Sequence, residues 1–543
     1  MSARTFRNLL LAATLVGGPI AASFSAWADE DDWPDYRHDR GRSGEQERHS
    51  ALSDPVKAPG LAVRWQWPPT AAGEGGSFYA SPIVIDGRVF IGSTTGRFYA
   101  LDAKTGALLW QFPPGPQPLL GSCTAGGVPQ SFGAYGILSS ASQYERLVIF
   151  GAPDPDPAVD GGLGSGRLWA VEMATGALAW KSDVLARVNG CTPGATGEQH
   201  ERIGYSSPLV REQTVYVGIH DAGDDPIQNG KLLAVNAKDG HLHSDFAFLA
   251  TSDRGGGIWN APAALDDDVL FTTGNTADGV VSEPVPNRGL SMIRIDGHSG
   301  ALDWQFQPVP FVLDDDPDWA AGVTVMHTSC GGIASSVMKD GWTYALRSSD
   351  GACRWQFPAT LPQSAACKFP TAGAHVHGDT DYKRPGAAWG DVLAIVTGGE
   401  GLVTAAGVTA GYGRLHGLNA CASTPAQRVR WIADVPNSSG SGYSLGAPTV
   451  TRGIFYIGTD QGHIVAFGDP SVVPPAGVRC SQVFTPVASC VASGFSLVWV
   501  PATLANVSLG DGSSAAGLRS EPALSDGRLF AATLGGHVYM LSP

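Results

Sequence analysis

The sequence predicts an all-β protein, an eight-bladed β-propeller with four-stranded antiparallel blades. Gly (71) and Pro (38) are abundant and charged residues make up only 16% of the 543 residues, a composition typical of strands and turns. A unit of four short strands recurs along the chain, and the two chain ends carry complementary parts of one further unit. A closed ring of such units buries the faces that a single unit would expose, so the repeat favours a propeller.

Residues 1–28 have the pattern of a secretory signal peptide. Two arginines precede a short apolar stretch, and Ala26-Trp27-Ala28 forms a small-x-small cleavage site. The apolar stretch is shorter than the roughly 20 residues that span a bilayer. We therefore expect a periplasmic or secreted protein with no membrane span, consisting of an N-terminal extension over 29–60 and the propeller over 61–543.

The clearest copy of the repeat begins at Ser81-Pro82. An alternating apolar strand follows, Asp86-Gly87 has the composition of a hairpin turn, and Thr105-Gly106 closes a second turn before the strand that ends at Trp110. The same Xaa-Pro start recurs later in the chain, at Ser207-Pro208, Ala261-Pro262, Ala447-Pro448 and Glu521-Pro522.

A tryptophan closes most copies, at intervals that average roughly 65 residues. The closing positions are Trp110, Trp180, Trp304, Trp355, Trp431 and Trp499, with Ser244 in the third copy. We expect the tryptophans at 110, 180, 304 and 355 to pack between blades rather than to serve a binding site.

The two chain ends together complete one blade. The last copy, over 521–541, stops without its closing strand, whereas 63–67 (Val-Arg-Trp-Gln-Trp) has the form of that strand without a preceding unit. Pairing between them closes the ring through backbone hydrogen bonds and leaves no open edge.

The net charge and the cysteine pattern exclude some classes of function for this chain. The formal net charge of −15 excludes the basic footprint of a nucleic-acid binder. Eight cysteines in an exported chain permit disulfides, with Cys353–Cys367 and Cys480–Cys490 as sequence-local pairings among many. No Cys-x-x-Cys-His motif occurs, so covalent c-type haem is not expected, and electrons would leave through another protein.

The repeat resembles that of the pyrroloquinoline quinone (PQQ) dehydrogenase superfamily over roughly residues 60–543, a repeat also found in non-catalytic relatives that include an outer-membrane assembly lipoprotein. Three regions strengthen the resemblance to the alcohol dehydrogenases of this superfamily. They are Gly255–Pro262 with Phe271–Asn275, Asp314–Trp319 with Lys339–Leu346, and Asp32–Asp39, which is similar to the opening of the polyvinyl alcohol dehydrogenase branch.

The resemblance implies a site for PQQ and a divalent cation, Ca²⁺. Trp259 would supply an apolar plane for the flat quinone, and Lys339 a cation for its edge. Asn275 would contact the cofactor and the metal, and Asp224 would add a carboxylate ligand. Asp318 is the candidate base that takes the proton of an alcohol.

Two departures from the family pattern bear on these roles. The family has a further Asp after the aromatic residue of the Asp-Trp segment, where this chain has Ala320 and Ala321, so the role of Asp318 stays open. The metal loop has Asp where relatives use Glu, one methylene shorter. Each candidate also has a structural alternative: a β-turn for Asn275, a solvated hairpin for Lys339, core packing for Trp259 and an exposed turn for Asp224.

These features favour a quinoprotein dehydrogenase that oxidises an alcohol, with polymeric secondary alcohols among the candidates, and that reduces a soluble acceptor such as a cytochrome c. The alternative is a non-catalytic propeller that acts as a protein-binding scaffold at the cell envelope. Ala320 favours the scaffold, whereas Trp259 and the Gly-Asn turn favour the enzyme. A sugar-binding or polysaccharide-degrading propeller is a weaker third reading, because no paired Asp or Glu at a glycosidase motif stands out.

Overall fold

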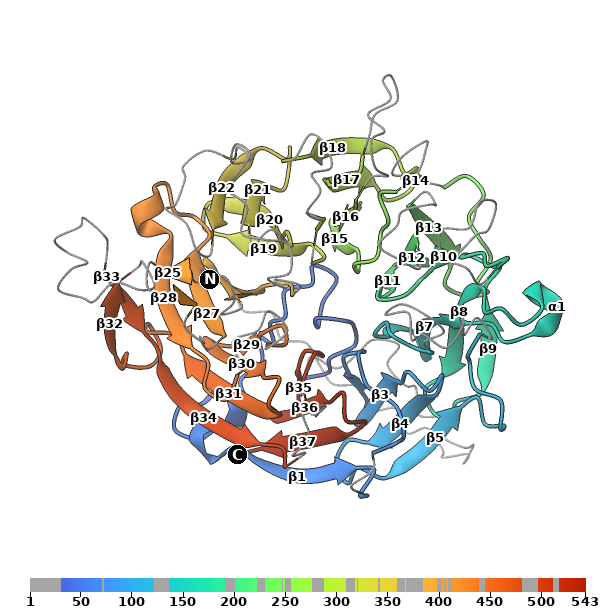
Figure 1. Ribbon diagram of the computed structural model, residues 1–543, viewed down its shortest axis with the longest axis horizontal. Helices are drawn as coiled ribbons and strands as arrows, with labels where there is room; N and C mark the ends of the chain where they lie inside the picture. The colour runs from blue at the N-terminus through green and yellow to red at the C-terminus, as the bar shows by residue number, and fades with distance from the viewer. Residues whose placement is uncertain are drawn as a thin grey trace, which may run out of the picture.

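The computed structural model contains a ring of eight antiparallel sheets, which confirms the predicted eight-bladed propeller (Figure 1). The described residues are 31–70, 73–121, 136–190, 201–221, 230–246, 248–249, 255–275, 288–308, 318–319, 321–339, 342–358, 367, 384–397, 403–404, 407–408, 413–438, 445–480, 497–510 and 517–543. The predicted export signal over 1–28 lies outside them and stays a prediction. Within the described part of the chain, no helix is long and apolar enough to cross a membrane.

Each blade runs outward from a short inner strand to an outer strand. Blades 1 to 4 consist of β2 (Ile83–Ile85), β3 (Arg88–Gly92), β4 (Phe98–Asp102) and β5 (Leu108–Phe112); β6 (Ser142–Tyr144), β7 (Leu147–Pro153), β8 (Gly166–Glu172) and β9 (Leu178–Lys181); β11 (Leu209–Arg211), β12 (Thr214–Asp221), β13 (Lys231–Asn236) and β14 (Phe248–Leu249); and β15 (Ala263–Leu265), β16 (Asp268–Thr272), β17 (Met292–Asp296) and β18 (Leu302–Phe306).

The second half of the ring repeats this order. Blades 5 to 8 consist of β19 (Thr324–Thr328), β20 (Gly331–Val337), β21 (Trp342–Arg347) and β22 (Cys353–Pro358); β23 (Ala387–Trp389), β24 (Val392–Thr397), β27 (Arg414–Asn419) and β28 (Val429–Asp434); β29 (Thr449–Thr451), β30 (Ile454–Gly458), β31 (His463–Gly468) and β34 (Ala502–Ser508); and β35 (Ala523–Ser525), β36 (Arg528–Ala532), β37 (Val538–Ser542) and β1 (Ala62–Trp67).

Several short strands, one short helix and three 3₁₀ turns lie outside the four-stranded blades. They are β10 (Glu201–Arg202) beside β12, the pair β25 (Val403–Thr404) and β26 (Gly407–Val408), the hairpin β32 (Gly477–Cys480) and β33 (Leu497–Val500), helix α1 (Pro157–Asp160), and 3₁₀ turns at Ala51–Ser53, Ala58–Gly60 and Pro425–Gln427.

One predicted closing tryptophan is wrong. Trp499 lies on β33, which pairs in parallel with β28 on the outside of blade 6, and the tryptophan is half exposed. The strand that closes blade 7 is β34, which follows it. The hairpin β32–β33 is an insertion, and its Trp falls at the expected spacing without being part of the repeat.

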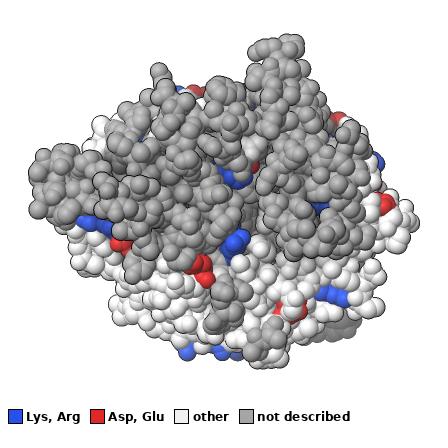
Figure 2. All heavy atoms as spheres, viewed as in Figure 1, with Lys and Arg blue, Asp and Glu red and all other residues white. Residues whose placement is uncertain are grey.

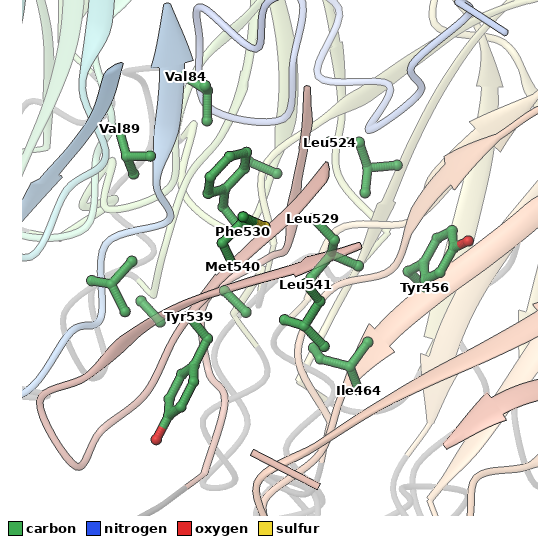
Figure 3. Close-up of a cluster of buried hydrophobic side chains, with 14 of the residues drawn as sticks. Val84, Val89, Tyr456, Ile464, Leu524, Leu529, Phe530, Tyr539, Met540 and Leu541 are labelled. Carbon is green, nitrogen blue, oxygen red and sulfur yellow. The ribbon is translucent and has the colours of Figure 1, made fainter. Parts of the chain in front are cut away.

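The predicted closure of the ring is confirmed. Strand β1 pairs antiparallel with β37 from Ala62 opposite Ser542 to Trp67 opposite Val538, so the first and last segments share blade 8. The hydrophobic core is continuous across this joint: Figure 3 shows side chains of blade 8 with Val84 and Val89 from blade 1 and Tyr456 and Ile464 from blade 7. Closure therefore buries apolar surface as well as satisfying the backbone.

The outer-strand tryptophans pack between blades, as predicted. Trp110 of blade 1 donates its indole N–H to the carbonyl of Met173 in blade 2, at 3.1 Å. Trp180 and Trp304 make the same bond to the next blade, with Ala237 and Ser348. Trp355 bonds Ala420 of blade 6 in the same way. Each indole thus links its own outer strand to a turn of its neighbour.

Substitutions at two glycines, Gly176 and Gly87, distinguish the contribution of this packing to stability from the cost of backbone strain. Gly176 has φ +69°, and a Cβ built on it would stand 2.6 Å from the Trp110 ring; Gly87 has φ +68°, and a Cβ there meets nothing within 4 Å. We expect Gly87→Ala to cost about 1–2 kcal/mol of unfolding free energy from the left-handed backbone alone. Gly176→Ala should cost about 1–3 kcal/mol more, because it displaces the indole. Urea denaturation checks this, and equal losses in the two variants would contradict it.

Two disulfides occur among the described cysteines. Cys353–Cys367 confirms one sequence-local pairing. Cys330–Cys421 joins blade 5 to the turn after β27 in blade 6 and was not anticipated, because its partners are 91 residues apart. The predicted Cys480–Cys490 pairing involves Cys490, which lies outside the described residues.

Residues 33–46 run through the centre of the ring and are named here the axial plug (Figure 1). Its backbone bonds the inner strands of six blades: Trp33 with Val84, Pro34 with Gln143, Arg40 with Ala264, Gly41 with Val325, Ser43 with Ala388, and Gly44 and Gln46 with Val450. Side chains reach the other two blades, where Arg42 donates to the carbonyl of Pro208 and Gln46 to that of Leu524. The plug therefore contacts all eight blades.

Two buried arginines anchor the axial plug. Arg37 donates to the carbonyls of Gly386 and Pro448 in blades 6 and 7. Arg42 donates to Pro262 in blade 4 and Pro208 in blade 3, at 2.9 Å each. These acceptors immediately precede the inner strands β23, β29, β15 and β11. The repeated segments before the inner strands direct these carbonyl groups toward the axis. The two guanidinium groups supply the hydrogen bonds that the carbonyls require.

Candidate active site

Trp259 and Asn275 lie on neighbouring segments at one end of blade 4. Trp259 precedes β15, and Asn275 follows β16. Two backbone hydrogen bonds hold the segments together, from the Gly256 N–H to the Asn275 carbonyl at 2.6 Å and from the Gly274 N–H to the Gly257 carbonyl at 2.8 Å. Glycines at 256, 257 and 274 let these backbones approach closely. The indole of Trp259 is half-buried, which leaves part of its surface accessible.

Asp318 and Lys339 form a buried ion pair at the same end of blade 5. A β-bridge between Trp319 and Met338 aligns their backbones, and the Lys339 N–H donates to the Asp318 carbonyl at 2.9 Å. The Lys339 Nζ lies 2.8 Å from Asp318 Oδ1, and both side chains are more than nine-tenths buried. An ammonium group at this distance stabilises the negative charge of the carboxylate.

The two blades bring these groups together. Lys339 Nζ lies 5.7 Å from the centroid of the Trp259 ring. Asp318 Oδ2 lies 3.4 Å from the point where a Cβ on Gly274, the neighbour of Asn275, would stand. The structure therefore gathers an aromatic face, an ammonium, a carboxylate and a backbone turn that carries an amide. Their roles in binding and catalysis stay predictions.

Asn260 supports this arrangement and was missed in the sequence. Its Nδ2 donates to the carbonyl of Trp319 at 2.9 Å and to Thr272 Oγ1 at 3.3 Å, which ties blade 4 to the segment that carries Asp318. Thr272 Oγ1 in turn donates to the carbonyl of Ala321 at 3.0 Å. Asn at this position, directly after Trp259, is the signal that sequence reasoning did not use.

The structure describes one of the two alanines, Ala320 and Ala321, that stand where the family has a further aspartate. Ala321, one of the two positions at which the family has the further Asp, is almost completely buried and packs beside Val337. Ala320 lies outside the described residues. Asp318 is the carboxylate of the described chain that contacts Lys339.

The metal ligands are only partly described. Asp224 lies outside the described residues, so its prediction is untested. Within the described part of the chain, no group of three or more His, Cys, Asp or Glu side chains is arranged to hold a metal ion. Asn275 and Asp318 supply oxygen atoms, the ligand type that Ca²⁺ prefers.

The other end of the propeller axis holds an acidic cavity of about 1320 Å³. Its wall includes Glu145, Glu212 and Asp266 from turns that follow the inner strands, together with acidic residues of the axial plug. Because Trp259 precedes β15 and Asp266 follows it, this cavity and the Trp259 site lie at opposite ends of the inner strands. The axial plug separates them.

Comparison with known proteins agrees with the sequence resemblance. A family model described as outer membrane protein assembly factor BamB matches residues 164–366. Lupanine 17-hydroxylase [cytochrome c] from a Pseudomonas species is 26% identical over 353 residues, covering 57% of this chain and 46% of the relative. Quinoprotein alcohol dehydrogenase PedH from Pseudomonas putida is 23% identical over 349 residues, covering 57% of this chain and 52% of the relative.

The resemblance to the quinoprotein dehydrogenases is confirmed. The chain spans about half the length of these curated relatives. Quinohemoprotein alcohol dehydrogenase from Comamonas testosteroni shares the fold, with a TM-score of 0.62, 14% sequence identity, and coverage of 94% of this chain and 80% of that structure. The polyvinyl alcohol dehydrogenase branch remains a prediction.

Proposed function

We propose that this chain is a quinoprotein alcohol dehydrogenase that uses PQQ and a divalent cation, Ca²⁺. One observation carries the proposal: the Trp259 ring, the Lys339 ammonium and the Asp318 carboxylate meet at one end of the propeller axis. The donor set matches the chemistry of PQQ, a flat aromatic quinone with carboxylates at its edge, which requires an apolar face and nearby cations. The relatedness to quinoprotein dehydrogenases supports the same function.

Bound PQQ would supply a quinone that accepts two electrons from the alcohol. In this proposal the Trp259 ring supports the quinone plane and Lys339 donates hydrogen bonds to its edge. Asp318 accepts the hydroxyl proton of the alcohol, since it is an anion held beside a fixed ammonium. Asn275, with Asp224, provides oxygen ligands for the cation, which would increase the electrophilicity of the quinone carbonyl.

The finer assignments are part of the same proposal. The substrate is an alcohol, with polymeric secondary alcohols as candidates, and a soluble acceptor such as a cytochrome c receives the electrons. The predicted signal over 1–28 assigns the protein to the periplasm or the exterior. The scaffold alternative draws support from the assembly-factor family match over 164–366. The part-exposed Trp259 ring beside Lys339 favours the dehydrogenase over the scaffold, because a flat cofactor requires an accessible aromatic face.

Binding of PQQ separates the two functions. We expect the purified protein to bind PQQ in the presence of Ca²⁺, as measured by retention of quinone absorbance after ultrafiltration. Trp259→Ala should weaken the affinity for PQQ roughly ten- to a hundredfold, because it removes the aromatic platform. Trp499→Ala is the matched control, since Trp499 is exposed on the outer hairpin of blade 6, and it should leave the affinity unchanged. If the unmodified protein did not bind PQQ, the dehydrogenase proposal would be wrong and the scaffold function would remain.

A further inference from the structure

The acidic cavity at the end of the axis away from Trp259 carries an excess of negative charge. Eight carboxyl side chains line it, against two arginines and two histidines. Two more arginines lie behind the lining: Arg211 Nη2 is 3.6 Å from Glu212 Oε1, and Arg42 is buried in the axial plug. Even with these two, the lining carboxyl groups outnumber the four arginines two to one. A cavity lined by one sign of charge concentrates ions of the opposite sign.

The lining carboxyl groups come from two parts of the fold. Glu145, Glu212 and Asp266 directly follow the inner strands β6, β11 and β15, and they are exposed. Others lie on or beside the axial plug, where burial and neighbouring carboxylates raise the pKa of Glu45 to about 7. On the face drawn in Figure 2, by contrast, the Asp and Glu atoms of described residues lie in separate small groups. A cation bound in the cavity would relieve this crowding of like charges.

Asp35 of the axial plug is the buried member of the lining. It is only 8% exposed, and its Oδ1 is buried and accepts no hydrogen bond from the described residues. The Ser142 hydroxyl favours the charged form of Asp35, but it donates its proton to the carbonyl of Pro208 at 2.6 Å. A buried carboxylate oxygen without a donor is costly, so a ligand that brings a charged donor to Asp35 would gain more there than at the exposed carboxylates.

The form of the lining indicates the kind of cation. Within the described part of the chain, no group of three or more His, Cys, Asp or Glu side chains is arranged to hold a metal ion. Apolar side chains line the cavity as well, among them Leu265, Val325 and Met326. A flexible alkyl chain can pack on them while its charged groups reach separate carboxylates. An ammonium suits a single buried oxygen better than a guanidinium, whose planar fork requires two acceptors.

We propose that this cavity binds a linear aliphatic polyamine, with one ammonium group on Asp35 and the others on the carboxylates that follow the inner strands of blades 2 to 4. The cavity volume of about 1320 Å³ is ample for such a molecule. The inference is independent of the proposed dehydrogenase activity, because the cavity and the Trp259 site lie at opposite ends of the inner strands. Its test therefore uses no quinone.

Isothermal titration of the full chain with spermidine tests the site, at about 0.1 M NaCl, where charges are screened beyond roughly 10 Å. Asp35→Asn should weaken binding roughly ten- to a hundredfold, because it removes the charge that accepts a hydrogen bond from a buried ammonium. A rim variant combines Glu145→Gln, Glu212→Gln and Asp266→Asn, which leave the axial plug intact. It should weaken binding roughly three- to thirtyfold, since each exposed carboxylate contributes less than a buried one.

Asp350→Asn is the matched control. Asp350 is exposed in the turn between β21 and β22, which the antiparallel order places at the same end of its blade as the turn after the inner strand, and it does not line the cavity. It should leave the affinity for spermidine unchanged. Thermal denaturation shows that each variant is folded, and spermidine should raise the Tm of the parent and of the control. If Asp35→Asn did not fold, the rim variant would decide.

Further probes identify the occupant. Cadaverine should bind more tightly than pentylamine, which has the same alkyl chain and one ammonium group fewer. Ca²⁺ alone should bind weakly, with an affinity that Asp35→Asn leaves unchanged. Equal spermidine affinity in the parent, Asp35→Asn and the rim variant would overturn the proposal, and so would tight Ca²⁺ binding that Asp35→Asn abolishes. Binding of tetralysine without binding of spermidine would replace the polyamine by a basic protein segment and would overturn it as well.

Discussion

Replacing Asp318 by Asn is expected to lower kcat for alcohol oxidation by roughly a hundred- to ten-thousandfold, with little change in the affinity for PQQ. Asn has the size of Asp and can still contact Lys339, so the site keeps its shape. It lacks the negative charge that accepts the hydroxyl proton. The measurement is steady-state dye reduction with PQQ and Ca²⁺ at saturating alcohol, alongside quinone retention for each variant.

Asp268→Asn is the matched control for this experiment. Asp268 also forms an ion pair on blade 4, with Arg294, but it lies on β16 at the end away from Trp259. Its loss should leave kcat unchanged. If Asp318→Asn retained the activity of the parent, the base would be a different group, and residues 314–316 would be the next to test. Loss of PQQ binding together with activity would instead make Asp318 a structural partner of Lys339.

The Asp318–Lys339 pair also predicts non-additive effects. Lys339→Met alone leaves a buried carboxylate without its cation, which costs about 3–5 kcal/mol of stability for pairs of this kind. Asp318→Asn alone leaves the ammonium buried beside a neutral amide. The double variant removes both charges, so its loss of unfolding free energy should be smaller than the sum of the two single losses. Additive losses in urea denaturation would indicate that the two charges do not interact in solution.

Much of the architecture follows from local sequence signals. Every blade packs against its neighbour in the same way, so the Xaa-Pro starts, the Asp-Gly turns and the closing tryptophans recur. The contact between Trp110 and Gly176 is an example of this repeated packing. The error at Trp499 has the same origin. A hairpin inserted beside blade 6 placed a tryptophan at the repeat spacing, and spacing alone does not distinguish an insertion from a blade.

Part of the candidate site could be predicted from the sequence for a related reason. Trp259 and Asn275 flank the first two strands of one blade, and Lys339 lies in a hairpin of the next, so propeller geometry brings them to one end. Asn260 was missed because its contacts join two blades through backbone carbonyls.

The axial plug was beyond prediction from periodicity, because it has no repeat of its own. Its hydrogen bonds go to short segments scattered from residue 84 to residue 524, and each looks unremarkable in the sequence. The arginines gave no signal either. Arg37 and Arg42 lie in a polar, charged stretch that reads as exposed, yet both are almost completely buried. Their significance lies in which carbonyls surround them.

Replacing Arg42 by Met is expected to cost about 3–5 kcal/mol of unfolding free energy. The change removes the donors to the carbonyls of Pro208, Pro262 and Tyr36, which remain buried without them. It also removes the positive charge that opposes the effect of burial on Asp35, whose pKa burial raises. Arg42→Lys should recover only part of the loss, because an ammonium cannot reproduce the planar fork that reaches blades 3 and 4 together.

Arg64→Met is the control for this prediction, since Arg64 is exposed on the outer strand of blade 8, and surface changes of this kind stay within about 0.5 kcal/mol. Urea denaturation followed by tryptophan fluorescence measures both variants. A loss in Arg42→Met no greater than that in Arg64→Met would show that the ring holds without the plug. The larger loss expected here would mean that β1–β37 pairing closes the ring at its circumference while the plug arginines close it at the axis. The Trp259 site then depends on both, because blades 4 and 5 must keep their relative positions for Lys339 to reach the indole.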